Sequence, residues 1–509
     1  MKTKRILAGV LACAAVFGSV MPTVSADDPV APTIMGDVNT DETVDISDVI
    51  LLSRYTAEDT KITVTKQGLA NADLNADGKY TAEDVTKIIR KIAMLDEPSR
   101  SGSKDLMEGI TASANFEGLD ADDAYTLAQT KFSLNLLKQN MVKADQKETN
   151  PLLSPLSAVF ALGMTANGAK GDTLTGMEDA LGGLPIDTLN RYLYTQRNIL
   201  NAGDNIKLAN AIWFRDDGTR ELPLESFLTC NADCYDAGLF AAPFDETTLD
   251  DVNGFVNENT AGRISKILDE ISEYDRMYLV NALTFDGQWG TPYEKYQVIP
   301  DEVFTAYDGT ENSINAMYSS EVYHYLEDEN ATGFVKWYEG GDYCFAALLP
   351  NEGVDIYDYV NGLDTEGFSA MLKKGMTESI PENWILHTMI PKFKLDYGCS
   401  MADSLKAMGM ETAFDDQTAD FSNMFEHALR DGVHIANVIQ KTHIEVSEAG
   451  TKAAAATIVI MEDSSCVSPE KTVDKYVYLD RPFVYMIMDA NTAVPVFIGM
   501  VTNLDGCSE

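Results

Sequence analysis

The segment 448–461, EAGTKAAAATIVIM, constrains the fold of this chain more than any other stretch. Four consecutive alanines favour a helix, whereas the Thr-Ile-Val-Ile run after them favours a strand. No charge follows Lys452 until Glu462, and no proline blocks the pairing of its backbone with a sheet. The segment is also far too short to cross a bilayer. In a strand, one face would carry only small or apolar side chains: Thr451, Ala453, Ala455, Thr457, Val459 and Met461.

The charge of the chain limits its partners. It has 509 residues, with 38 basic and 80 acidic side chains and a formal net charge of −42. Such a surface repels phosphate backbones and anionic lipid, so we expect neither nucleic-acid nor membrane binding. Hydrophobic residues make up 45% of the chain, which is enough for a sizeable core.

The N-terminus is predicted to be a signal peptide over residues 1–26. A basic start, Lys2 to Arg5, precedes an apolar stretch at 6–20 and a small-residue cleavage site at 24–26. A lipoprotein signal ending at Cys13 is the alternative. Of the six cysteines that remain, Cys230 and Cys234 could form a local bridge or stay as buried thiols.

Two acidic stretches near the N-terminus share one pattern. Residues 37–48 read DVNTDETVDISD, and residues 73–84 read DLNADGKYTAED. Both place oxygen-bearing side chains at positions 1, 3, 5, 9 and 12 of a 12-residue calcium loop, although position 12 is Asp rather than Glu. Each is followed by an apolar-periodic helix. The predicted ligands are Asp37, Asn39, Asp41, Asp45 and Asp48 in the first copy and Asp73, Asn75, Asp77, Thr81 and Asp84 in the second.

This duplicated loop–helix unit, residues 34–97, resembles a type I dockerin. The resemblance implies a small all-α domain, two bound Ca²⁺ ions and a cohesin partner on a cellulosomal scaffoldin. Loop positions 10 and 11 face cohesin in dockerins, and here they are Ile46, Ser47, Ala82 and Glu83. Alternatively, the calcium only folds a small domain that lacks enough core of its own. Residues 98–119, rich in Ser and Gly at their start, are predicted to be a linker.

The remaining part, 120–505, is predicted to be an α+β domain with a large sheet. Helical spacing occupies its start, and alternating or β-branched strands dominate later. The chain lacks the GxSxG and HExxH motifs, and its five histidines are scattered, so no catalytic residues are predicted. The predicted helices are 124–141 and 155–167; the predicted strands are 207–214, 277–285, 343–349, 442–446, 483–489 and 494–501.

Six segments of this domain, in order, resemble the serpins: 150–173, 252–268, 279–293, 390–398, 478–487 and 496–504. The resemblance implies a serpin fold, in which a large central sheet is surrounded by helices and an exposed reactive loop. It places Ser154, Ser157 and Asn281 at the shutter of that sheet and Trp289 at its breach. Gln440 stands where most members carry a shutter histidine, so the shutter hydrogen bonds must close differently here.

By the same resemblance, the opening segment is the hinge of an inhibitory reactive loop, with Glu448, Gly450, Thr451, Ala453 and Ala455 as hinge residues. Counting from Gly450 places the scissile bond between Ser464 and Ser465, within one or two residues. A small polar residue there does not suit a trypsin-like protease. It suits subtilisin- or elastase-like serine proteases, or papain-like cysteine proteases.

These features predict a secreted, monomeric suicide inhibitor of serine proteases, attached to the cell-surface cellulosome of an anaerobic bacterium. The protein would trap the acyl-enzyme when its cleaved loop enters the sheet. One alternative is a non-inhibitory serpin that is only cleaved. The other is a carbohydrate-active enzyme engaged in polysaccharide breakdown, as most dockerin-bearing chains are, although no aromatic-rich sugar cleft is evident.

Overall fold

A computed structural model describes most of the chain as two compact units, Met1–Arg100 and Ser101–Glu509, each of which is described by itself. The described residues are 34–41, 43–57, 61–74, 79–92, 102–113, 116–141, 150–216, 218, 222–235, 237–272, 275–428, 432–451 and 472–506. The predicted signal peptide lies outside them. No helix within these ranges is both long and apolar enough to span a membrane.

The described part of the first unit has three helices around a small apolar core. α2 (Ile46–Thr56) and α4 (Ala82–Ile92) follow the two acidic stretches, as predicted, and α3 (Lys66–Ala72) lies between them in the chain. Asp45 caps α2 by accepting a hydrogen bond from Ser47 N, and Asp48 completes a capping box. The buried apolar residues are few: Val38, Val49, Leu52, Ala72, Val85 and Ile88. So small a core is consistent with a domain that needs a metal ion for stability.

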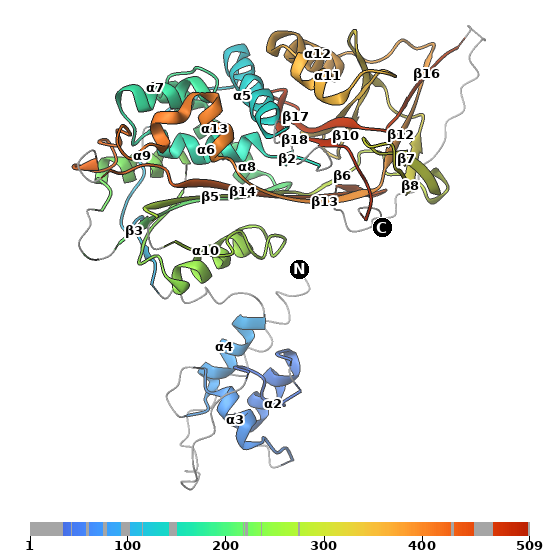
Figure 1. Cartoon of the computed structure of the whole chain (residues 1–509). Helices are drawn as coiled ribbons and strands as arrows, with labels where there is room; N and C mark the ends of the chain where they lie inside the picture. The colour runs from blue at the N-terminus through green and yellow to red at the C-terminus, as the bar shows by residue number, and fades with distance from the viewer. Residues whose placement is uncertain are drawn as a thin grey trace. The chain divides into compact units, whose positions relative to one another are not determined.

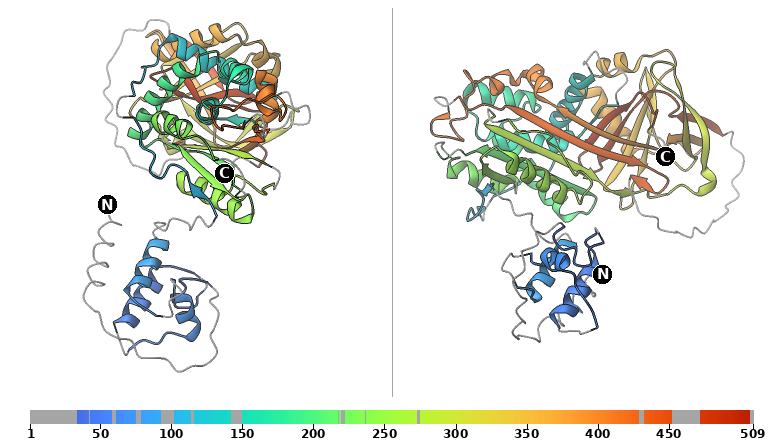
Figure 2. Two further views of the ribbon diagram at one scale, coloured as in Figure 1. Left: turned by 90° about the vertical axis from the view of Figure 1, so that its left-hand side faces the viewer. Right: turned by 60° about the horizontal axis from the view of Figure 1, so that its bottom comes forward.

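Three sheets form the frame of the second unit (Figures 1 and 2). The central sheet has eight described strands, in the order β1-β4-β3-β5-β14-β15-β6, with β13 also paired to β14. Its strands are β1 (Lys104–Asp105), β3 (Ile206–Arg215), β4 (Gly238–Ala242), β5 (Met277–Phe285), β6 (Gly287–Gln288), β13 (Phe393–Ser400), β14 (Asn437–Val446) and β15 (Gly450–Thr451).

The other two sheets are smaller. A six-stranded sheet contains β2 (Leu152–Leu153), β18 (Val494–Val501), β17 (Phe483–Asp489), β11 (Tyr343–Pro350), β10 (Ala331–Trp337) and β9 (His324–Glu327), in that order. A four-stranded sheet contains β16 (Val473–Tyr478), β12 (Trp384–Pro391), β8 (Glu311–Ser319) and β7 (Val298–Thr305). β5, β11, β17 and β18 are buried along their whole length, which explains their nearly continuous apolar sequences.

Helices cover both faces of the central sheet. Figure 1 shows α6 on one side and α10 on the other. Every residue of α6 is buried, and Ser154 caps its N-terminus by accepting from Ser157 N. The helices of this unit are α5 (Asp123–Met141), α6 (Pro155–Ala166), α7 (Gly171–Ala180), α8 (Ile186–Ala202), α9 (Glu225–Tyr235), α10 (Glu246–Asn259), α11 (Ile356–Gly362), α12 (Thr365–Thr377) and α13 (Ala402–Leu405).

Part of the segment predicted as a linker, 98–119, is attached to this unit. β1 pairs with β4 at the edge of the central sheet, and Ser103 Oγ accepts a hydrogen bond from the Trp213 indole. Leu119 N donates to Arg191 O at 3.0 Å. The linker is therefore shorter than predicted, because these backbone groups have partners on the folded domain.

Candidate functional site

The central sheet is forked at one end. β5 and β14 pair directly and in parallel, from Tyr278 opposite Asn437 to Thr284 opposite His443. Beyond that stretch, β15 lies between β14 and β6 and is antiparallel to both. A strand that continued past Thr451 would therefore run between β5 and β14. It would replace one parallel pairing with two antiparallel pairings, which are slightly more stable per residue.

The fork requires a glycine at its tip. Gly450 pairs with Gln288, and a Cβ atom added at Gly450 would lie 2.1 Å from Gly287 O. A tight turn precedes it, in which Ser447 N donates to Gly450 O at 2.9 Å. Glycine lets the chain enter the sheet where no side chain would fit.

Trp289, predicted at the breach, holds the same turn. Its indole Nε1 donates to Ser447 O at 2.8 Å, and its backbone N donates to Ala449 O at 3.0 Å. The indole stacks on Tyr338 with a centroid distance of 4.5 Å and an angle of 8° between the rings. Tyr338 OH in turn shares a 2.6 Å hydrogen bond with Thr451 Oγ1. The breach therefore fixes the position from which the reactive loop would enter.

A buried lysine lies beneath the breach aromatics. Lys336 is 5% exposed, and its Nζ donates to Thr291 O at 2.9 Å. Nζ also lies 4.5 Å from the ring centroid of Tyr293 and 5.5 Å from that of Trp289. Burial lowers the pKa of Lys336 to about 8. The ammonium is thus held by one carbonyl and two ring faces in a place where its charge is costly.

The predicted hinge residue Glu448 forms an ion pair with Lys392, with 2.7 Å between Oε2 and Nζ. The hydrogen bond from Lys392 lowers the pKa of the Glu448 carboxyl. Lys392 lies between β12 and β13, so the pair links the start of the hinge to the four-stranded sheet. No sequence spacing pointed to this partner, because the two residues lie far apart in the chain.

The side-chain amide of Gln440 forms three hydrogen bonds at the predicted shutter. Gln440 Oε1 accepts from Ser154 N at 2.9 Å, and Gln440 Nε2 donates to Ser154 O at 2.9 Å and to Asn281 Oδ1 at 3.1 Å. Asn281 also donates to Ser157 O, and Ser154 Oγ donates to Val496 O at 2.9 Å. The network therefore joins β5, β14 and the buried helix α6. An amide fills the histidine position because it supplies both an acceptor and two donors.

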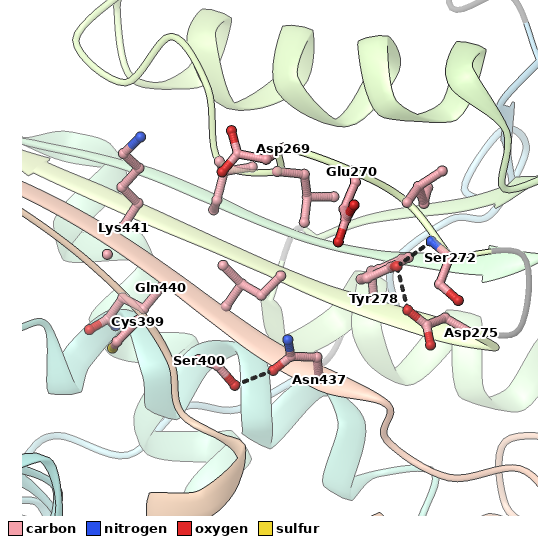
Figure 3. A pocket seen from close by; sticks show the side chains of 15 residues that line it. Asp269, Glu270, Ser272, Asp275, Tyr278, Cys399, Ser400, Asn437, Gln440 and Lys441 are labelled. Carbon is pink, nitrogen blue, oxygen red and sulfur yellow. Dashed lines mark hydrogen bonds between the residues drawn. The ribbon is translucent and has the colours of Figure 1, made fainter. Parts of the chain in front are cut away.

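A cavity of about 670 Å³ opens at the other end of the β5–β14 seam (Figure 3). Its lining combines the connection between α10 and β5, residues 267–272, with residues from β13 and β14. Tyr278 OH donates to Asp275 and accepts from Ser272 N, while Ser400 Oγ donates to Asn437 Oδ1. Because the cavity spans the seam, parting β5 from β14 would change its shape.

The remaining loop residues, Ala453, Ala455, Ser464 and Ser465, lie in 452–471, outside the described residues. Cys230, Cys234, Cys344 and Cys399 are free thiols, so the local bridge considered for the first pair is not formed. A hydrogen bond from Cys234 instead lowers the pKa of Cys230.

In the first unit, the first acidic loop is organised around a buried aspartate. Asp48 Oδ1 accepts from Val38 N and Asn39 N, at 2.7 and 2.9 Å, and its Oδ2 accepts from Asp45 N. Asp37, 2% exposed, lies in the same loop and accepts from Asp41 N. Two buried carboxylates in one short loop repel each other, and a divalent cation relieves that repulsion. Oxygen donors of this type are the ones that Ca²⁺ takes in proteins.

The other predicted ligands are less fully described. Asp84 is buried and accepts from Leu74 N and Thr81 N, which repeats the arrangement around Asp48. Asn75 and Asp77 lie outside the described residues. Within the described part of the chain, no group of three or more His, Cys, Asp and Glu side chains is arranged to hold a metal.

The predicted cohesin face is exposed where it is described. Ile46 is 47% exposed and Ser47 is also exposed, whereas the side chains of Ala82 and Glu83 lie outside the description. Ile50, one turn after Ile46 on α2, is 53% exposed. Sequence reasoning missed Ile50 because its position in an apolar run indicated a core residue.

Comparison with known proteins assigns both units. The serpin (serine protease inhibitor) family model matches residues 127–504, and the dockerin type I domain model matches residues 35–93. The chain belongs to the serpin family and carries an N-terminal type I dockerin domain. Its α+β serpin fold is as predicted. The family is named for serine protease inhibition, and the relatives of this chain include a protease inhibitor.

Individual relatives cover nearly the whole large unit. Leukocyte elastase inhibitor of Bos taurus is 29% identical over 390 residues, covering 74% of this chain and 98% of that protein. Serpin-Z2A of Triticum aestivum is 28% identical and covers 74% of this chain and 95% of its own length. The crystal structure of the thermophilic serpin tengpin in its native state is 37% identical, with a TM-score of 0.71, covering 79% of this chain and all of that chain. Tengpin in its latent state gives a TM-score of 0.63 at 35% identity, covering 76% and 99%.

Proposed function

We propose that this protein is an inhibitor that traps a serine protease once per molecule. The protease nucleophile attacks the carbonyl carbon of Ser464, the peptide bond to Ser465 breaks, and the amine of Ser465 leaves with the proton that the protease supplies. The Ser464 acyl group stays bonded to the protease. The freed loop then enters the fork and carries the protease with it before water can release the acyl group.

The observation that carries this proposal is the match between the fork and the loop sequence. Thr451 lies opposite Val446 on β14 and Gly287 on β6. If that register continues, Ile460 reaches the far end of β14 and Met461 reaches the far end of β5. The stretch that fits between these strands therefore ends just before Glu462, the first charge after Lys452.

The side-chain pattern agrees with that register. Thr451 is 1% exposed and bonded to Tyr338, which belongs to the main core. Alternate residues after Thr451 would face the same core, and among the first of them are Ala453 and Ala455. Lys452, the one charge before Glu462, would face the opposite side of the sheet.

Covalent trapping is tested by mixing the protein with subtilisin and running a denaturing gel. A band at the summed mass of the inhibitor and the protease is expected. The matched control is Thr451→Arg, which places a charge on the core face of the entering strand. That variant should be cut at the same bond without forming the band. Clean cleavage of the unaltered protein would support a non-inhibitory serpin instead, and the same assay with papain tests a cysteine-protease target.

We further propose that the first unit attaches the inhibitor to an extracellular cellulosome by binding a scaffoldin cohesin. Two Ca²⁺ ions would be held by the two acidic loops, and residues 1–26 would direct secretion. Type I dockerin domains bind calcium, and the first ion would be held by the predicted ligands of the first loop: Asp37, Asn39, Asp41, Asp45 and Asp48. Calorimetry with a type I cohesin should show binding in Ca²⁺ that is lost in EDTA and regained on adding Ca²⁺. Binding unaffected by EDTA would contradict the proposal.

A further inference from the structure

One face of the four-stranded sheet carries a row of aromatic rings. His387 stacks on Tyr476 at 4.7 Å with 13° between the rings; Tyr476 lies 5.8 Å from Tyr478, and Tyr478 lies 5.5 Å from Tyr318. The sheet register explains the arrangement, since His387 pairs with Tyr476 and Met389 pairs with both Tyr478 and Tyr318. We call these four side chains the aromatic row.

The aromatic row has the properties of a binding surface. Tyr476 is 60% exposed, and Ile385, which pairs with Asp474 on the same face of the sheet, is 36% exposed. Tyrosine is enriched in the residues that dominate protein interfaces, because it offers a large contact area with few rotatable bonds. The stack on His387, which is itself bonded to Asp474 at 2.9 Å, already orders Tyr476. Binding through this ring would therefore cost little side-chain entropy.

The position of β16 in the chain indicates which partner would reach the aromatic row. β16 is the first strand after 452–471, the segment that contains the proposed scissile bond. Val473 lies eight positions after Ser465 in the sequence, so at most about 28 Å of chain joins them. That distance is no more than the width of a small protein domain. A protease engaged at the bond holds the residues after it on its leaving-group side, and that side is within reach of the aromatic row.

We propose that the aromatic row is a second contact site for the target protease, on the leaving-group side of its cleft. Asp474 and Glu302, which bonds to Tyr318, add carboxylates at the edge of the row. The matching protease surface would be apolar with a basic rim. This inference rests on the proposed function, because it requires a protease at the loop.

The test measures docking separately from trapping. Subtilisin whose catalytic serine is replaced by alanine can bind the loop but cannot cut it, so its dissociation constant reports docking alone. Tyr476→Ala should weaken this binding about tenfold and slow inhibition of active subtilisin about equally. Tyr476→Phe, which keeps the ring, should retain most of both. Ile199→Ala, at a 42% exposed site on α8, is the control for loss of an exposed apolar side chain.

The outcomes separate the two proposals. Unchanged docking in Tyr476→Ala, with the same thermal unfolding as the unaltered protein, would overturn the aromatic row as a protease contact. Self-association that Tyr476→Ala abolishes, without a change in docking, would also overturn it and assign the row to contacts between copies. Failure of the unaltered protein to form the covalent band refutes the trapping mechanism, whereas the docking measurement remains valid.

Discussion

The shutter amide allows a quantitative prediction. Gln440 is 1% exposed, and its side chain makes three hydrogen bonds, two with the backbone of Ser154 and one with Asn281. Gln440→Ala removes all three and leaves buried polar groups without partners. At about 1–1.5 kcal/mol for each bond, the free energy of unfolding should fall by about 3–4.5 kcal/mol. The first transition in urea-induced unfolding, followed by circular dichroism, measures this change.

The bond to Asn281 also crosses the seam that the loop would open. β5 and β14 are in direct register at this pair, so an inserted strand would separate the two side chains. Gln440→Ala should therefore also speed spontaneous loop insertion on warming, seen as loss of inhibitory activity without cleavage. The control is Gln417→Ala, which removes an exposed glutamine bonded to Asp416 and should change neither quantity. A loss below about 1 kcal/mol in Gln440→Ala would refute the shutter account.

Three further predictions concern other parts of the molecule. The lowered pKa of Lys336, about 8, means that its charge destabilises the fold below that pH. The free energy of unfolding should rise by up to about 3 kcal/mol as the pH increases from 8 towards 10.5. Lys336→Met should remove this rise, which urea unfolding at a series of pH values would measure. Gly450→Ala, whose Cβ would meet Gly287 O, should hinder entry of the loop, so more inhibitor is cleaved per protease trapped in a titration. Asp48→Asn should weaken calcium binding to the first loop at least tenfold by calorimetry, whereas Asp105→Asn, at an exposed site in the other unit, should not.

Much of the large unit was predictable because its central strands are buried on both faces. The strands predicted at 277–285, 483–489 and 494–501 match β5, β17 and β18 residue for residue, since their continuous apolar runs end at polar or turn residues. The helix predicted at 124–141 begins one residue earlier. Long apolar runs with clear ends strongly indicate a buried strand or helix and its bounds.

Less regular elements were harder to predict. β7 is mostly exposed and lacks a clean alternation, so its residues gave no strand signal. The segment 252–268, one of those that resemble the serpins, is not a single element: α10 ends at Asn259, and the rest belongs to the connection to β5. The segment 390–398 likewise spans the end of β12 and the start of β13, which meet at Lys392.

The candidate site was also predictable only in part. The resemblance to the family named Ser154, Asn281 and Trp289; the structure places the first two in hydrogen bonds with Gln440 and the third in a hydrogen bond with Ser447 O. The amide bonds of Gln440 and the ion pair of Glu448 with Lys392 depend on contacts between distant parts of the chain. No local pattern encodes such contacts, so they could be found only in the folded structure.

The central claim is that the uncleaved protein is held above its lowest free energy until the loop is cut. The most direct measurement is the melting temperature before and after cleavage between Ser464 and Ser465. The fork between β5 and β14 predicts a large increase, because the cut loop adds a strand that pairs on both sides. An unchanged melting temperature in a sample shown by mass spectrometry to be fully cleaved at that bond would contradict the claim.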